Sequence, residues 1–202
     1  MTRIWHGLVA SLVAFALIGQ TVQTVDRGNS LTNLFSYFTI ESNLLVLVSC
    51  VLIAIRPDRE STAFQILRLG SLVAITVTGI VYATLLAGNG SFTGIEWWYD
   101  KIFHYVVPLM SVAGFLASPS RLRFDRRAMW FLVFPLVWLA YTLTRAEAVE
   151  PVFALTKDTT APVPYGFLDV GEHGAIAVGV ACVVLTAVFV LIAEAAIRIS
   201  RR

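Results

Sequence analysis

Four polar residues in an apolar stretch have the spacing and the side chains for chemistry inside a membrane. Thr32, Ser36, Thr39 and Asn43 lie in LTNLFSYFTIESNLLVLVSCVLIAI, positions 31–55. On a helix they fall at i, i+4, i+7 and i+11, which aligns hydroxyl and amide groups in one narrow stripe. In lipid, such a stripe either packs closely against another helix or lines a cavity for binding or catalysis. Both interpretations stay open on this stretch alone.

His104 and Asp100 could together supply the base that the Thr39 hydroxyl needs in order to act as a nucleophile. A threonine hydroxyl is a poor nucleophile unless an adjacent base takes its proton, and a neutral imidazole such as that of His104 suits this task. Asp100 precedes His104 by four residues, on the same helix face, where it could accept a hydrogen bond and fix the tautomer. The competing interpretation of His104 is a buried, hydrogen-bonded structural histidine.

Attack on an ester carbonyl also requires donors for the developing oxyanion. The candidates are Asn43, one helical turn from the threonine, and Tyr165 in a later loop. Asp169 lies with Glu172 and His173 at the start of the last apolar segment. A carboxylate there either caps a helix N-terminus or contributes to the same pocket.

Glu41 is the acidic residue that falls near the middle of the bilayer. A charged carboxylate at that depth costs about 3 kcal/mol. Glu41 points about 200° around the helix from Thr39, so it does not belong to the Thr39 face. The sequence favours a structural hydrogen bond, to Thr76, Thr78 or Tyr37, over a proton path.

The composition indicates an integral membrane protein. Hydrophobic residues make up 57% of the chain and charged residues 14%, with a mean hydropathy of +0.77. Ordinary soluble chains carry about 25% charged residues. The net charge of +2 comes from basic residues gathered in particular loops. It therefore reports orientation in the membrane and gives no reason to expect nucleic acid.

The apolar segments predict an all-α fold, a bundle of six transmembrane helices that forms a single domain over residues 1–202. A spanning helix needs about 20 mostly apolar residues, so six spans leave no room for a separate soluble domain. The predicted spans are 4–25, 31–55, 66–87, 97–117, 128–144 and 174–197.

The distribution of the 15 basic residues predicts the orientation. The loops at Asp26, at Asn89 and at 147–172 should face outward, because their side holds only Arg27, Lys101, Arg145 and Lys157. The positive-inside rule places the other side, with both termini, in the cytoplasm. That side holds Arg3, Arg56, Arg59, Arg68, Arg121, Arg123, Arg126, Arg127, Arg198, Arg201 and Arg202.

In this orientation Thr39 and His104 lie at similar depths. At 1.5 Å per residue, Thr39 lies about 12 Å below the outer end of the second span. His104 lies about 10 Å below the outer end of the fourth span. The two side chains can therefore meet in the outer-leaflet half of a core about 30 Å thick, provided that the helices are neighbours.

Two further features concern the backbone near this site. Pro108 and Pro135 are expected to kink their helices. The segment PVPYGFLDV, positions 162–170, has no helical periodicity and is expected to fold over the outer mouth of the bundle.

Metal and disulfide chemistry have little support in the sequence. Cys50 and Cys182 lie inside predicted spans without CxxC spacing, so we interpret both as small apolar residues. His6 lies at the inner end, which leaves only His104 and His173 in the outer half, too few ligands for a haem or metal site. We expect no metal and no organic cofactor.

Three motifs resemble a known family. SYFTIESNLL at 36–45, DKIFHYVVPL at 100–109 and PVPYGFLDV at 162–170 resemble a bacterial family of small six-span membrane proteins. That family is similar to the androgen-induced and androgen-dependent TFPI-regulating membrane proteins of animals, which hydrolyse fatty acid esters of hydroxy fatty acids with one Thr and one His. The resemblance implies that Thr39 is the nucleophile and His104 the base. Glu41 and Gly166 depart from the family pattern, which often has Gln and Pro there.

Together these features predict a hydrolase of lipid esters in a bacterial cytoplasmic membrane, with its site in the outer-leaflet half. The substrate would be a membrane lipid or a lipid-like ester, and Thr39 and His104 would be catalytic. The supporting candidates are Asp100, Asn43, Ser36, Tyr165 and Asp169. The alternative is a non-catalytic binding or transport protein that holds a lipid or a small solute in the same polar pocket.

Overall fold

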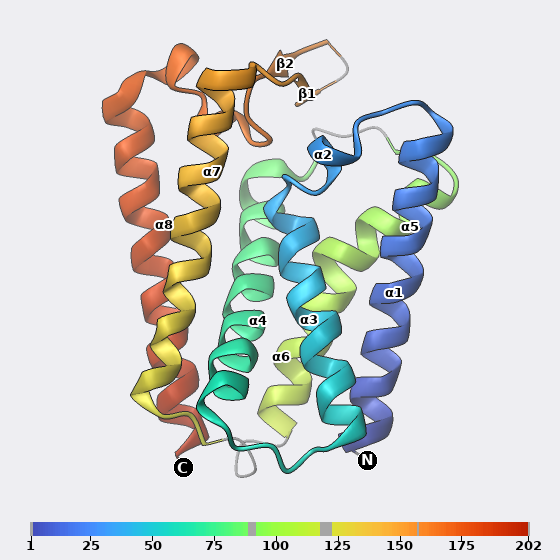
Figure 1. Cartoon of the computed structure of the whole chain (residues 1–202), viewed down its shortest axis with the longest axis vertical. Coiled ribbons are helices and arrows are strands. Elements are labelled where there is room, and N and C mark those ends of the chain that lie inside the picture. Colours follow the sequence, from blue (N-terminus) through green and yellow to red (C-terminus); the bar gives the residue numbers. More distant parts are fainter. Residues whose placement is uncertain (1, 89–91, 118–122, 157, 202) are drawn as a thin grey trace.

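The computed structural model describes residues 2–88, 92–117, 123–156 and 158–201. These residues form a helical bundle with one short β hairpin, and both termini lie at the same end of the molecule (Figure 1). The predicted loop at Asn89 and three of the counted basic residues, Arg121, Lys157 and Arg202, lie outside the described residues.

Helices make up most of the described chain. The α-helices are α1 (Thr2–Asp26), α2 (Leu31–Leu34), α3 (Phe38–Ile55), α4 (Thr62–Val81), α5 (Ile95–Lys101), α6 (Val107–Ala117), α7 (Val133–Val149) and α8 (Val170–Ser200). Tyr82–Leu86 and Ile102–Val106 are π-helical turns, and Arg126–Leu132 and Gly166–Leu168 are 3-10 helices. The hairpin pairs β1 (Phe153–Ala154) with β2 (Thr160–Ala161) in antiparallel register.

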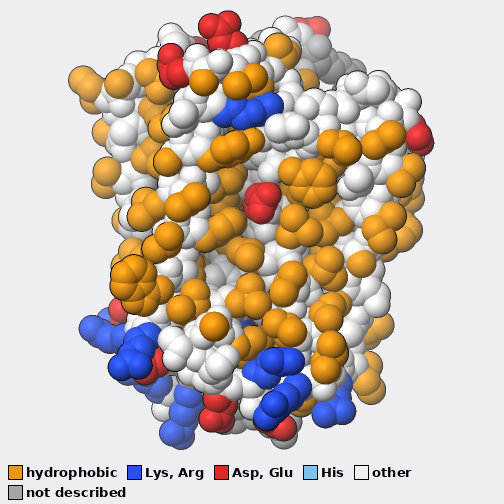
Figure 2. Space-filling view, in the orientation of Figure 1, with side chains coloured by type: hydrophobic (Ala, Val, Ile, Leu, Met, Phe, Trp, Pro, Cys, Tyr) orange, Lys and Arg blue, Asp and Glu red, His pale blue; other side chains and the backbone are white. Residues whose placement is uncertain are grey.

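Among the described residues, five helical segments are long and apolar enough to cross a membrane. They are Thr2–Asp26, Phe38–Ile55, Thr62–Leu86, Arg126–Val149 and Val170–Ser200. Figure 2 shows hydrophobic side chains over the middle of the visible face, while most visible Lys and Arg side chains gather at the end that holds the termini. An apolar band with basic residues at one edge is the surface that a bilayer requires. The predicted helical class is confirmed, and so is the presence of helices long and apolar enough to cross a membrane.

The second predicted span is interrupted, so the continuous helix expected over 31–55 is wrong. The chain leaves helical conformation between α2 and α3, and Tyr37 precedes α3 in an extended conformation. Ser36 therefore lies outside α3, and its hydroxyl donates to the Thr32 carbonyl oxygen at 2.6 Å. The polar stripe is divided between two segments.

The fourth predicted span consists of α5, a π-helical turn and α6, and α5 is tilted strongly relative to α6 (Figure 1). The π-helical turn between α5 and α6 has a local cause. Pro108 has no N–H to donate to the His104 carbonyl four residues earlier. The preceding turn widens, and the Val107 N–H donates to the Ile102 carbonyl five residues earlier.

The helices are arranged around α3, which packs against both α1 and α4. The α7–α8 pair lies beside α4, on the side away from α1 (Figure 1). Close approach of the 3-10 helix that precedes α7 depends on Gly70 of α4, since a Cβ there would lie 3.0 Å from the Phe131 Cβ. Toward the opposite end from the termini, α3, α4, α7 and α8 surround the cavity described next.

Candidate active site

Thr39 lies in the first turn of α3, where the backbone amides have no helical partner. Its N–H donates to the Tyr165 hydroxyl oxygen at 3.1 Å, and the same oxygen lies 3.2 Å from Thr39 Oγ1. Thr39 is 8% exposed. The break before α3 therefore places this hydroxyl at a helix N-terminus, where the helix dipole favours negative charge.

The imidazole of His104 lies within hydrogen-bonding distance of Thr39. Nε2 is 3.2 Å from Thr39 Oγ1. Nδ1 is 2.9 Å from the Asp100 carbonyl oxygen and 3.0 Å from the Asp100 carboxylate oxygen Oδ1. A carbonyl oxygen only accepts, so Nδ1 carries the hydrogen and neutral His104 presents an unprotonated Nε2. The Thr39 hydroxyl can therefore donate its proton to His104.

The Asp100 carboxylate is held on its other side by two residues that the sequence did not single out. Its Oδ2 accepts a hydrogen bond from the Tyr82 hydroxyl at 2.7 Å and one from Lys101 Nζ at 2.8 Å. The Tyr82 ring also stacks on the imidazole, with ring centroids 3.9 Å apart and an angle of 14° between the planes. The orientation of His104 is thus fixed by its neighbours on three sides.

Both π-helical turns contribute to this arrangement. Tyr82 begins one of them, and His104 lies within the other. They come together because Gly79 has no side chain. A Cβ at this position would lie 2.9 Å from the Pro108 Cβ and 3.4 Å from the His104 carbonyl oxygen. Single π turns within helices are frequent at functional sites. No periodicity in the sequence reveals them.

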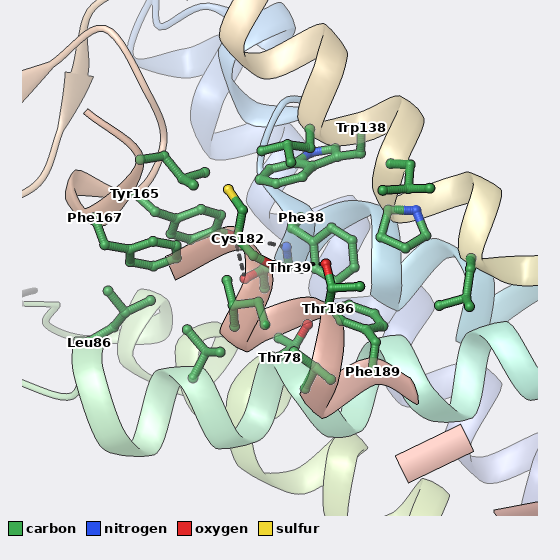
Figure 3. A pocket seen from close by; sticks show the side chains of 18 of the residues that line it. Phe38, Thr39, Thr78, Leu86, Trp138, Tyr165, Phe167, Cys182, Thr186 and Phe189 are labelled. Atoms are coloured by element: carbon green, nitrogen blue, oxygen red, sulfur yellow. Dashed lines mark hydrogen bonds between the residues drawn. The ribbon is translucent and has the colours of Figure 1, made fainter. Parts of the chain in front are cut away.

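Thr39, His104 and Tyr165 lie on the wall of a cavity of about 150 Å³. The remaining wall is almost entirely apolar and comes from α3, α4, α7, α8 and the loop before α8. Figure 3 shows Thr39 beside Tyr165, with aromatic side chains around the hollow. The labelled aromatic residues are Phe38, Trp138, Tyr165, Phe167 and Phe189. The loop at 162–170 thus contributes Tyr165, Phe167 and Leu168 to the cavity wall, and Tyr165 was expected near Thr39 from the sequence.

Asn43 and Ser36 do not face this cavity. The Asn43 side-chain amide donates to the carbonyl oxygens of Thr39, at 2.8 Å, and Phe103, at 3.5 Å. Asn43 is fully buried and does not belong to the cavity wall, so the geometry gives no support to its expected role as an oxyanion donor. The Ser36 hydroxyl instead contacts Tyr141, outside the cavity lining. Both residues hold the backbone near the site.

Asp169 is a helix cap. Its Oδ1 accepts hydrogen bonds from the Gly171 N–H at 2.9 Å and the Glu172 N–H at 3.2 Å, at the start of α8. It is not part of the cavity wall. Of the two interpretations of this carboxylate, the structure favours the cap.

In the described part of the chain, Glu41 forms none of the hydrogen bonds expected with Thr76, Thr78 or Tyr37, and the two threonines are engaged elsewhere. The Thr76 hydroxyl donates to the Leu72 carbonyl at 2.6 Å. The Thr78 hydroxyl lies 2.9 Å from that of Ser42.

Within the described ranges, no group of three or more His, Cys, Asp or Glu side chains could hold a metal ion. Cys50 and Cys182 are both free thiols. The reactive groups that the structure brings together are the Thr39 hydroxyl, the His104 imidazole and the Asp100 carboxylate.

No protein-family model, no curated protein and no solved structure matches this chain.

Proposed function

We propose that this protein is an intramembrane hydrolase of lipid esters. The observation that carries the proposal is the 3.2 Å contact between Thr39 Oγ1 and the unprotonated Nε2 of His104, on the wall of an apolar cavity. Apolar walls suit an acyl chain, and the polar groups are gathered where the ester would lie.

In the first step, Thr39 Oγ1 attacks the ester carbonyl carbon while His104 Nε2 takes the hydroxyl proton. The imidazolium that forms is stabilised by the carboxylate of Asp100, 3.0 Å from Nδ1. The tetrahedral intermediate then collapses, the bond to the alcohol oxygen breaks, and His104 returns the proton to the leaving alcohol. The product is an acyl ester on Thr39.

The developing oxyanion needs donors, and two lie next to the nucleophile. They are the Thr39 N–H at the start of α3 and the Tyr165 hydroxyl. Burial raises the pKa of Tyr165, so its phenol stays protonated and remains a donor over the ordinary working range. A carbonyl oxygen bound here would replace the hydrogen bond that Tyr165 now accepts from Thr39.

Water completes the cycle. A water molecule attacks the acyl carbon, His104 takes one of its protons, and the acyl–Oγ1 bond breaks. Thr39 regains its proton from His104, and a carboxylic acid is released. The atoms balance as ester plus water giving acid plus alcohol.

We also propose how the chain crosses the membrane. The segment 95–117 would form a sixth span, with both termini in the cytoplasm and the site in the outer-leaflet half of a bacterial cytoplasmic membrane. The basic residues near the terminal end support this orientation. The resemblance to membrane threonine hydrolases supports the same reaction and the same two residues.

A second candidate is a lipid-binding protein without catalysis. One observation favours it: Tyr165 already accepts a hydrogen bond from the Thr39 N–H. In that function the polar groups would hold a lipid headgroup and the apolar walls its chain.

Hydrolysis of a fluorogenic long-chain ester by the purified protein distinguishes the two candidates. Thr39→Ala should abolish turnover. Thr186→Ala is the matched control, because Thr186 lines the same cavity but its hydroxyl donates within α8, to the Cys182 carbonyl at 2.8 Å. Equal turnover in wild type and Thr39→Ala would reject the hydrolase and leave the binding protein.

A further inference from the structure

A second, smaller cavity lies toward the end of the bundle that holds both termini. It has a volume of about 30 Å³ and is lined by residues of α1, α3, α4 and α6. The polar residues among them include His6, Ser49, Arg68 and Ser111. None of these four belongs to the wall of the Thr39 cavity.

Arg68 is buried, and its guanidinium is only partly hydrogen-bonded. Arg68 is only 7% exposed. Its Nη2 lies 3.4 Å from His6 Nε2, and within the described ranges its Nη1 has no hydrogen-bond partner. His6 Nδ1 lies 2.8 Å from the Thr2 carbonyl oxygen and therefore carries the hydrogen, so neutral His6 accepts through Nε2. One hydrogen bond is satisfied, but the positive charge is not neutralised.

No Asp or Glu side chain compensates this charge. All 13 Asp and Glu residues lie within the described ranges, and none has an oxygen within 4.0 Å of Arg68. A buried charge without a counter-charge is strongly destabilising. An anion in the adjacent cavity would remove this cost.

The cavity offers further donors for such an anion. The Ser111 hydroxyl oxygen is also buried without a partner in the described part of the chain. Ser49, 3% exposed, lies on the same wall. Two unpartnered groups, a guanidinium nitrogen and a hydroxyl, thus border one small space from two different helices.

We propose that this cavity binds a small monovalent anion, held by Arg68 with Ser111 and Ser49. A space of about 30 Å³ is little more than a water needs, so it admits a single halide ion or the carboxylate end of a fatty acid. The inference does not depend on the reaction at Thr39.

Trp5 supplies a direct probe, because it lines this cavity. Bromide quenches tryptophan fluorescence, and an ion bound beside Trp5 should add a saturable component to the linear quenching of exposed tryptophans. The experiment titrates sodium bromide against sodium gluconate, at constant ionic strength, into the purified protein in phosphatidylcholine nanodiscs. Trp5→Phe should remove the saturable component.

The arginine variants test the assignment. Arg68→Gln should weaken bromide binding at least about tenfold, because it removes a charged donor. Arg56→Gln is the matched control, since Arg56 is an exposed arginine at the end of α3, and it should bind like wild type. Ser111→Ala keeps the charge and should weaken binding about threefold, which gives a second reading if the Arg68 variant does not fold.

Competition distinguishes the two sources of the anion. Displacement of bromide by chloride but not by decanoate identifies a free halide. Displacement by decanoate at much lower concentration identifies the carboxylate end of a lipid. Strictly linear quenching in wild type, or a saturable component of equal strength in Arg68→Gln, would overturn the proposal.

Discussion

His6, which is buried, and His104, which is partly buried, have the same local geometry and different partners. His104 Nδ1 lies 2.9 Å from the carbonyl oxygen of Asp100, and His6 Nδ1 lies 2.8 Å from that of Thr2, each four residues earlier. In both cases the hydrogen is on Nδ1 and Nε2 is left as an acceptor. The two sites differ in the group that faces Nε2.

The partner of Nε2 determines what each histidine can do. His104 faces the Thr39 hydroxyl, which has a proton to give, and has a carboxylate behind it to stabilise the imidazolium. His6 faces Arg68, whose guanidinium does not release a proton under ordinary conditions. The same hydrogen bond thus prepares a base at one end of the bundle and a structural acceptor at the other.

The largest expected effect separates the two histidines directly. His104→Gln should lower ester hydrolysis at least about 100-fold, because general base catalysis is lost. His6→Gln should leave hydrolysis within about threefold of wild type, since His6 does not border the Thr39 cavity. Steady-state rates on the fluorogenic ester measure both. A similar loss in both variants would erase the distinction and indicate a shared structural role.

The next effect concerns the oxyanion donor. Tyr165→Phe should lower the turnover number by about 100-fold with little change in KM, because the donor acts mainly in the transition state. Tyr141→Phe is the control: its hydroxyl contacts Ser36 and not the nucleophile. Because burial raises the pKa of Tyr165, the wild-type rate should not fall between about pH 8 and 9. Retained turnover in Tyr165→Phe would exclude this donor.

A packing change should have a smaller effect. Gly79→Ala places a Cβ 2.9 Å from the Pro108 Cβ. The π turn that carries His104 must then shift, which should lower hydrolysis about tenfold and stability by about 1–3 kcal/mol. Gly179→Ala, where a Cβ meets nothing within 4 Å, is the control. Rates and thermal unfolding report the two effects, and an unchanged Gly79→Ala enzyme would show that this close approach is dispensable.

The smallest effect should come from Lys101, which partly neutralises Asp100. Lys101→Met removes one of the two donors to Asp100 Oδ2 but leaves the Tyr82 hydrogen bond and the contact with His104 Nδ1, so ester hydrolysis should stay within about threefold of wild type. Steady-state rates on the fluorogenic ester measure this change. A loss of tenfold or more would show that Lys101 is needed to hold the carboxylate in place.

Much of this site follows from the sequence because helix geometry fixes depth. Thr39 and His104 were expected at similar depths from the rise per residue alone, and the structure brings them within 3.2 Å. Tyr165 was expected near the same site from its loop. Hydropathy likewise predicted the helical class and the helices that are long and apolar enough to cross a membrane.

The remaining features depend on tertiary packing and could not be predicted. The break before α3 changes which residues share a face, and it removed Ser36 from the predicted stripe. The two π turns rotate Tyr82 and His104 into contact, which an ideal helical wheel does not anticipate. Asn43 had the right spacing but forms hydrogen bonds with backbone carbonyls instead of facing the cavity.

The central claim is that the Thr39 hydroxyl is a nucleophile activated by His104. Its most direct test is covalent trapping with a fluorophosphonate probe, followed by peptide mass spectrometry of the labelled protein. Wild type and His6→Gln should carry the adduct on Thr39, and His104→Gln should carry almost none. An adduct on another residue, or equal labelling of Thr39 in His104→Gln, would contradict the account.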